Sequence, residues 1–195
     1  MTSLNQARDQ QPPALRDIPG WMNPKDLIVI AGLAAAVPPD GLIVEVGSWM
    51  GQSTQAWAAN TSATVIAIDL WKWMPKEYKG PFGDTVDLKG DPLKQFLAFT
   101  AHLPNVVPIQ RNSSGGDWPH PPADIVFIDA MHQAPWVAED VAYWETKVKP
   151  GGIICGDDYA NMFPAVKEEA AACAERHGVP LETPGHKFWM VRLPG

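Results

Sequence analysis

The sequence predicts an α/β fold built on a doubly wound sheet of seven strands, mostly parallel, with an antiparallel C-terminal hairpin. Three observations support this prediction. Short runs of apolar and β-branched residues alternate with segments of helical length, as in βαβ units. Most of these runs are apolar throughout, which is typical of parallel strands covered on both faces. The last two runs are joined by a short turn at Pro184 and Gly185, so they should pair antiparallel.

Local signals place the individual elements along the chain. Asn23 and Pro24 favour a helix start, because a capping side chain precedes a proline in the first turn, and Asp91 and Pro92 give the same signal. Gly178 favours the end of the last helix. Helices are expected at 24–36, 53–60, 92–102, 134–147 and 164–177. Strands are expected at 42–46, 64–68, 106–110, 124–128, 152–155, 181–183 and 188–193. This order of elements is that of a Rossmann-like, doubly wound fold.

Length and composition are those of a single globular domain. The chain has 195 residues, of which 46% are hydrophobic and 19% are charged. We expect an irregular N-terminal arm at 1–22 and one domain at 23–195. The arm should either close the pocket or pack on a second copy of the chain, which would make a homo-oligomer. The segment 70–90 is long for a loop in a compact domain, so it should be either a lid or a cluster packed on the sheet edge.

Charge and cysteine content restrict the class of partner. The chain has 15 basic and 22 acidic residues, a formal net charge of −7, and no basic run, which argues against nucleic acid. The longest apolar run, 27–37, is too short to span a bilayer, so no membrane partner is expected. Cys155 and Cys173 fit no zinc or redox spacing and are expected to be reduced. A cytoplasmic location and a small-molecule partner are therefore expected.

The first predicted strand runs into a glycine turn suited to a nucleoside. Gly47 and Gly51 are four positions apart, and Trp49 stands where a dinucleotide motif needs its second glycine. A bulky indole disfavours a pyrophosphate there, whereas the two glycines still allow a tight turn past a flat or zwitterionic ligand. Asp69 ends the second strand, where an acid suits the two hydroxyls of a ribose. The alternative is an ordinary turn and an ordinary capping aspartate.

These two segments resemble the first two motifs of class I S-adenosylmethionine-dependent methyltransferases. The resemblance implies a methionine pocket shaped by the first segment, a ribose held by Asp69, and an adenine bordered by residues 111–114. It also makes 23–195 a single methyltransferase domain. The implied cofactor-binding residues are Glu45, Gly47, Ser48, Gly51, Ser53, Asp69, Leu70, Asn112, Ser113 and Asp129.

Acidic residues follow the fourth and fifth predicted strands. Asp129 ends the fourth strand, and Asp157 and Asp158 follow the fifth. Because these strands should be neighbours, the three carboxylates should meet in one small volume. Like charges raise one another's pKa, and a hard divalent cation would remove the conflict. The alternative is that Asp157 and Asp158 cap a helix or form a turn, and since consecutive residues point in different directions, one of them could ligate alone.

The acidic segments, together with Asp140 and Trp144, resemble those of metal-dependent sugar and macrolide O-methyltransferases and of cephalosporin-hydroxylase-like proteins. The similarity covers roughly residues 40–160. It implies Asp129 and His132 as catalytic residues, with His132 as general base. It implies the metal ligands Asp129, Asp157 and Asp158. A divalent metal would lower the pKa of an alcohol, and a histidine could accept its proton. Residues expected to face the substrate are Trp49, Trp71, Trp73 and Tyr159.

The resemblance therefore implies S-adenosylmethionine as cofactor and Mg²⁺, or another hard divalent cation, as metal. The implied reaction is O-methylation of a hydroxyl on a small molecule such as a sugar, a macrolide or another natural product. Two alternatives stay open, namely a metal-independent methyltransferase of the same class on another acceptor and a non-catalytic nucleoside-binding domain. An NAD-dependent oxidoreductase is disfavoured by Trp49 in the glycine turn.

Overall fold

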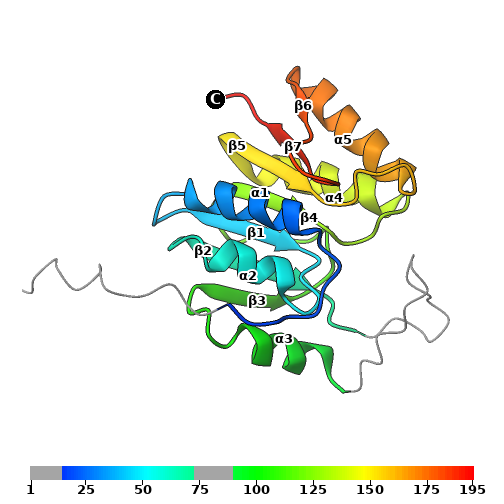
Figure 1. Ribbon diagram of the computed structural model, residues 1–195. Coiled ribbons are helices and arrows are strands. Elements are labelled where there is room, and N and C mark those ends of the chain that lie inside the picture. The colour runs from blue at the N-terminus through cyan, green and yellow to red at the C-terminus, as the bar shows by residue number, and fades with distance from the viewer. Residues whose placement is uncertain (1–14, 73–89) are drawn as a thin grey trace, which may run out of the picture.

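The computed structural model describes residues 15–72 and 90–195. Within these ranges seven strands form one sheet in the order β3-β2-β1-β4-β5-β7-β6 (Figure 1). The strands are β1 Leu42–Val46, β2 Thr64–Asp69, β3 Val106–Gln110, β4 Ala123–Ile128, β5 Val148–Gly156, β6 Leu181–Glu182 and β7 Trp189–Arg192. The helices are α1 Pro24–Ala35, α2 Gln52–Ala58, α3 Pro92–Thr100, α4 Trp136–Trp144, the 3₁₀ helix η1 Glu145–Lys147 and α5 Pro164–His177.

The sheet has the predicted doubly wound topology. Strands β1 to β5 run parallel, whereas β7 pairs antiparallel with both β5 and β6. The predicted fold class and the antiparallel C-terminal hairpin are therefore confirmed. Since β1 lies between β2 and β4, the winding reverses at β1, and open α/β sheets bind ligands outside the carboxyl ends of the strands at such a point.

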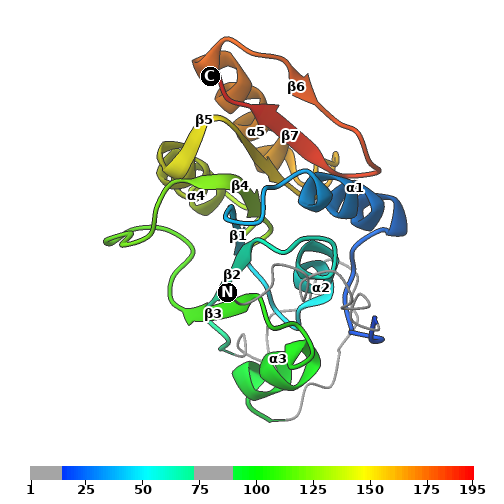
Figure 2. The same ribbon diagram turned by 90° about the vertical axis from the view of Figure 1, so that its left-hand side faces the viewer.

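Helices cover both faces of the sheet (Figure 2). Successive residues of a strand point to opposite faces, and β4 shows this alternation clearly. Phe127 packs with Trp57 of α2, with ring centroids 5.6 Å apart, in a core cluster shared by α1 and α2. Val126 belongs to the other cluster, together with Trp144 of α4 and residues of α5. Both tryptophans are fully buried, so each face of the sheet has an apolar core of its own.

Strand β5 begins earlier than the sequence predicts. It starts at Val148 instead of residue 152, and its pairing with β4 shifts register between Ala123 and Ile125. Pro150 and Gly151 explain this difference, because proline and glycine typically interrupt a strand. Here they lie within β5, where the hydrogen-bond pairing with β4 is irregular. Gly151 has a φ of 74°, and its N–H donates to Pro194, at 2.8 Å.

The described part of the N-terminal arm lies along α2. The side chain of Gln55 accepts a hydrogen bond from the backbone N–H of Arg16, at 2.8 Å, and Gln52 accepts one from Met22, at 3.1 Å. Residues 1–14 of the arm and 73–89 of the expected loop lie outside the described residues, and so does Trp73. None of the described helices combines the length and the apolar character needed to cross a membrane.

A buried carboxylate ties the first helix to the last strand. Asp26 of α1 is fully buried, and its Oδ1 accepts a hydrogen bond from the backbone N–H of His186, at 2.6 Å. Both of its oxygens also accept from the N–H of Lys187, at 3.3 and 3.2 Å. The side chain of Asp26 thus provides hydrogen-bond acceptors for the backbone N–H groups that precede β7. From the sequence alone, Asp26 is only an acidic residue in the first turn of a helix.

Replacing this carboxylate should destabilise the protein. The Asp26→Ala variant would leave two partly buried N–H groups without their acceptor, so we expect the free energy of unfolding to fall by about 1–3 kcal/mol. Urea unfolding followed by circular dichroism measures the change. The matched control is Asp40→Ala, since Asp40 is exposed in the turn before β1 and should unfold like the wild type. Equal stability of the two variants would contradict the structural role of Asp26.

Candidate active site

A cavity of about 340 Å³ opens at the carboxyl ends of the parallel strands, near the switch point of the sheet. Its volume lies in the usual range of small-molecule sites. Many residues singled out from the sequence line it: Gly47, Ser48, Trp49, Ser53, Asp69, Leu70, Ser113, Asp129, His132, Asp157 and Asp158. The lining also includes Lys187, which sequence reasoning missed, because nothing local distinguishes a lysine that precedes the final strand.

Several predicted site residues lie elsewhere: Glu45, Gly51, Trp71, Asn112 and Tyr159. Trp71 is only 3% exposed and packs on Phe96, with ring centroids 4.7 Å apart. Its indole N–H donates to the backbone oxygen of Trp49, at 2.8 Å. This corrects the expectation that Trp71 faces the substrate, because the first aromatic residue after β2 folds under the turn. Tyr159 is partly buried and packs against the core cluster on the α4 and α5 side, outside the lining of the cavity.

The turn after β1 has a geometry that requires glycine. Gly47 has a φ of 94°, and a Cβ there would lie 2.1 Å from the backbone oxygen of Asp129. Asp69 holds the turn from the neighbouring strand, since its Oδ2 accepts from the N–H of Trp49, at 2.9 Å, and its Oδ1 from that of Trp71, at 2.7 Å. Burial raises the pKa of Asp69. Each oxygen keeps a further lone pair for a ligand hydroxyl.

A second carboxyl lies beneath the same turn. Glu45 is fully buried in β1, and the hydroxyl of Thr54 donates to its Oε2. Burial raises the pKa of Glu45 to about 7, against the opposing effect of the nearby hydroxyls. Its Oε1 and the buried Oγ of Ser48 have no hydrogen-bond partner among the described residues. A polar or cationic ligand group at the turn would satisfy atoms of this kind.

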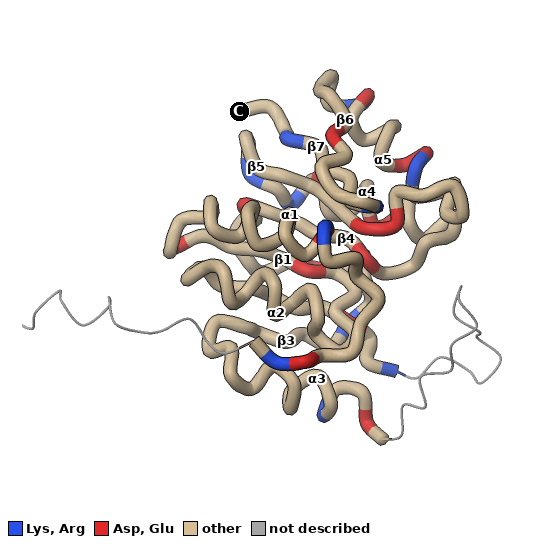
Figure 3. Tube along the Cα trace, in the orientation of Figure 1, with Lys and Arg blue, Asp and Glu red and all other residues tan. Residues whose placement is uncertain are grey.

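The acidic residues after β4 and β5 meet at one edge of the cavity, where Figure 3 shows acidic positions side by side. His132 joins two of them, with its Nε2 at 3.2 Å from Oδ1 of Asp129 and 2.8 Å from Oδ2 of Asp158. Lys187 joins Asp158 to Asp157, forming an ion pair with Oδ1 of Asp158 and lying 3.4 Å from Oδ2 of Asp157. Asp129, His132 and Asp158 each offer a potential metal-ligand atom, and these three atoms lie within 4.8 Å of one another. The sequence predicted a metal-ligand group with Asp157 in place of the histidine.

These contacts set the protonation states in the cluster. Burial alone would lower the pKa of His132, but hydrogen bonds and charge from Asp129 and Asp158 raise it to about 10. Burial would raise the pKa of Asp158, but His132 and Lys187 hold it below its ordinary value. Burial raises the pKa of Asp157, and the charges of Asp129 and Asp158 add to this effect. His132 is therefore an imidazolium at neutral pH in this arrangement and has no lone pair for another proton. Any proton taken up here is accepted by the hydrogen-bonded group of His132 and its two carboxylates as a whole.

Two tryptophans form one wall of the cavity. The rings of Trp21 and Trp49 stack with centroids 4.3 Å apart and an interplanar angle of 17°. Trp21 is 53% exposed and belongs to the arm. The described part of the arm therefore contributes to the lining of the cavity.

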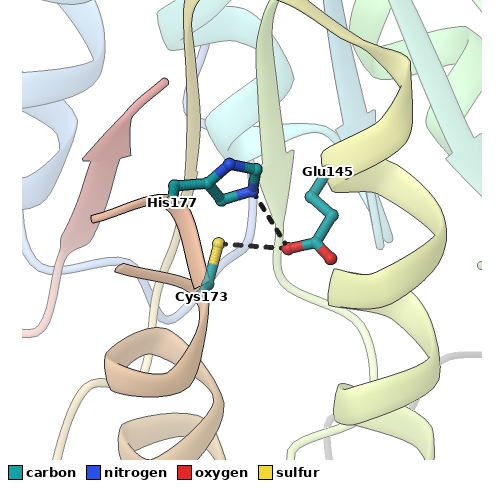
Figure 4. A group of neighbouring side chains, drawn as sticks. All are labelled: Glu145, Cys173 and His177. Atoms are coloured by element: carbon teal, nitrogen blue, oxygen red, sulfur yellow. Dashed lines mark hydrogen bonds and ion pairs between the residues drawn. The ribbon is translucent and has the colours of Figure 1, made fainter. Parts of the chain in front are cut away.

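A second group of potential metal ligands lies outside this cavity, where η1 meets the end of α5 (Figure 4). Glu145 Oε2 lies 3.5 Å from the thiol of Cys173 and 3.4 Å from Nε2 of His177. Arg176 donates to the same oxygen, at 2.9 Å. Burial, with Glu145 nearby, raises the pKa of Cys173 to about 12, so the thiol keeps its proton. Glu145 already has three partners, and the group is explained as a link between η1 and α5.

A family model described as a methyltransferase domain matches residues 44–159, from β1 to just beyond β5. The chain belongs to this methyltransferase family. Membership confirms the resemblance to class I S-adenosylmethionine-dependent methyltransferases, and the match covers the glycine turn, Asp69 and the acidic cluster. No curated protein matches the chain significantly.

Solved structures share the methyltransferase fold at low sequence identity. The O-methyltransferase NovP superposes with a TM-score of 0.66 at 16% identity, covering 88% of this chain and 80% of that one. An rRNA methylase from Streptococcus thermophilus gives 0.62 at 12% identity, covering 90% and 100%. An O-methyltransferase from Bacillus cereus, in complex with SAH, gives 0.58 at 14% identity, covering 87% and 80%. At such identities the likeness establishes the fold alone, and these relatives differ in acceptor.

Glu45 gives this methyltransferase a testable pH dependence. Its pKa is about 7 when folded and 4.5 as the ordinary value, so the folded state binds more protons between these limits, and stability is lost as pH rises through them. Glu45→Gln removes this ionisation. The free energy of unfolding of the variant minus that of the wild type should rise by about 2 kcal/mol when the pH is raised from 5 to 8, as measured by urea unfolding. A difference that does not vary with pH would contradict the raised pKa.

Proposed function

We propose that the protein is an S-adenosylmethionine-dependent O-methyltransferase that acts on a hydroxyl group of a small molecule. One observation carries this proposal. A single cavity is bordered on one side by the glycine turn with Asp69, and on the other by the linked side chains of Asp129 and His132. The first side suits a nucleoside cofactor, and the second suits the removal of a proton from an acceptor.

The residues present fit S-adenosylmethionine. Asp69 has lone pairs left for the two ribose hydroxyls, and Ser48, which lines the cavity, has an orphaned Oγ at the turn proposed for the methionine part. Ser113 lines the cavity on the side proposed for the adenine. When bound, this cofactor supplies a methyl group on a sulfonium, which needs no activation beyond an aligned nucleophile.

The acceptor's proton is assigned to the pair formed by Asp129 and His132. Both side chains line the cavity, and Nε2 of His132 already contacts Oδ1 of Asp129. A hydroxyl in the cavity would give its proton to this pair while the oxygen attacks. His132 also contacts Asp158, which keeps its ring in place, and such positioning is a large part of what a methyl transfer needs.

A small acceptor suits both the volume and the wall of the cavity. The cavity volume of about 340 Å³ is in the range of small-molecule sites, and the same cavity holds the cofactor side and the acceptor side. The stacked Trp21 and Trp49 offer an aromatic surface to a flat or apolar face, such as that of an aromatic ring or a sugar. The net charge of −7 disfavours an RNA acceptor.

The metal implied by the sequence does not fit beside the residues that the structure places here. Oxygen ligands from Asp129 and Asp158 would suit Mg²⁺. However, Asp158 contacts both His132 and Lys187, Asp129 contacts His132, and Asp157 lies beside Lys187. A divalent ion would have to displace the ammonium group of Lys187, so the proposed reaction has no step through a metal.

Cofactor binding is the first test. Isothermal titration with S-adenosylhomocysteine (SAH) should show one site per chain, and NAD should show none. Asp69→Ala removes the acceptor of the ribose hydroxyls, so the Kd for SAH should rise about tenfold or more. The control Asp117→Ala removes an exposed carboxylate outside the cavity and should bind like the wild type. Binding of NAD without SAH would overturn the assignment of the cofactor.

The catalytic assignment is tested with His132→Gln. The release of SAH is followed with a panel of small aromatic and sugar hydroxyls, and with an rRNA fragment as a contrasting acceptor. We expect kcat to fall by about 10²-fold or more, with an unchanged Kd for SAH, because proton removal is impaired. The control His186→Gln changes an exposed histidine. Full activity of His132→Gln would contradict the proton role, and activity on RNA alone would contradict the acceptor class.

A further inference from the structure

Lys187 stands inside the acidic cluster and not on the surface. Its ammonium group forms an ion pair with Asp158 and lies 3.4 Å from Asp157, and its side chain is only 16% exposed. It lines the same cavity as Asp129 and His132. An ammonium group is a compact charge with three donor hydrogens. Two of these hydrogens point toward the carboxylates of Asp157 and Asp158, so one hydrogen is left for a ligand oxygen.

The backbone of Lys187 is held on both sides. Its N–H donates to the buried carboxylate of Asp26, and its carbonyl oxygen accepts from the N–H of Tyr159, at 2.8 Å. Asp26 belongs to the first helix, and Tyr159 directly follows the acidic pair 157–158. The backbone of Lys187 is therefore fixed relative to the carboxylates, and its ammonium group is held by the ion pairs with Asp158 and Asp157.

Every carboxylate of the cluster already has a basic partner. His132 contacts Asp129 and Asp158, and Lys187 contacts Asp158 and Asp157. Two built-in basic groups therefore offset much of the charge that a divalent ion would otherwise offset, although Oδ1 of Asp157 is buried without a hydrogen-bond partner among the described residues. Adding Mg²⁺ to this arrangement would bring it within a few ångströms of an ammonium group, and such like-charge contact is unfavourable when partly buried.

We propose that Lys187 is the resident cation of this active site, in the place where related sequences imply a divalent metal, so that the enzyme binds its cofactor and transfers methyl groups without metal. This inference rests on the proposed O-methyltransferase function and deepens it. The third hydrogen of the ammonium group would donate to the acceptor oxygen as negative charge develops there, which is the electrostatic help that a metal would give. The acceptor's proton still goes to the pair of Asp129 and His132.

The test compares metal binding and cofactor binding in wild type and three variants. Isothermal titration with MgCl₂ or MnCl₂ should show no site in the wild type, and EDTA should leave the Kd for SAH unchanged. Lys187→Met removes the charge but keeps the length of the side chain, so the carboxylates that lose their ammonium partner should bind Mn²⁺ at one site per chain, with a Tm that rises on addition of metal. Lys187→Arg keeps the charge and should bind no metal.

The matched control is Lys149→Met. Lys149 is also paired with an aspartate, since its Nζ lies 2.9 Å from Asp124, but at the opposite end of β4 and away from the cavity. This variant should gain no metal site. Stoichiometric Mg²⁺ or Mn²⁺ binding by the wild type, or a Lys187→Met variant that still binds no metal while it binds SAH, would overturn the inference. Failure to bind SAH in any form would instead contradict the proposed function, so the two outcomes are distinguishable.

Discussion

The active site depends on the pairing of three carboxylates with two basic side chains at the ends of β4 and β5. Parallel neighbouring strands end at the same edge of the sheet, so Asp129, Asp157 and Asp158 are brought together by topology. Carboxylates so close together raise one another's pKa and oppose folding unless they are compensated. His132 and Lys187 supply this compensation from within the chain, and the cluster remains polar at one edge of the cavity.

The pairing also involves segments from the N-terminal and C-terminal parts of the described chain, since both parts contribute residues to the cavity. Lys187 reaches the cluster because β7 inserts between β5 and β6, which brings the segment before β7 next to the end of β5. Asp26 fixes that segment from α1, and Gln52 on α2 fixes Met22 of the arm. Polar side chains that accept from backbone N–H groups thus connect distant parts of the chain around one site, and each of them is satisfied by its own partner.

Much of this could be predicted from the sequence, because the decisive signals are local. Capping residues, prolines and short apolar runs mark the elements, and the glycine turn and acids after strands are placed by the topology that those elements imply. The start of β5 could not be predicted, since Pro150 and Gly151 mark a break that the sheet absorbs as an irregularity. Lys187 could not be predicted either. Its role depends on which of the last two strands pairs with β5, and no local sequence pattern shows that β7 and not β6 is the neighbour of β5.

Trp49, in the turn after β1, also has a conformation that depends on contacts with distant residues. It has a φ of 40°, an unfavourable conformation for a bulky residue, which persists only where the surroundings enforce it. Three contacts do so here. Its N–H donates to Asp69, its carbonyl oxygen accepts from the indole of Trp71, and its own indole stacks on Trp21. A glycine would adopt this backbone without strain, but it would leave Trp21 without a partner and open that wall of the cavity. The strained tryptophan is therefore best understood as the cost of an aromatic wall beside a nucleoside turn that has no pyrophosphate to admit.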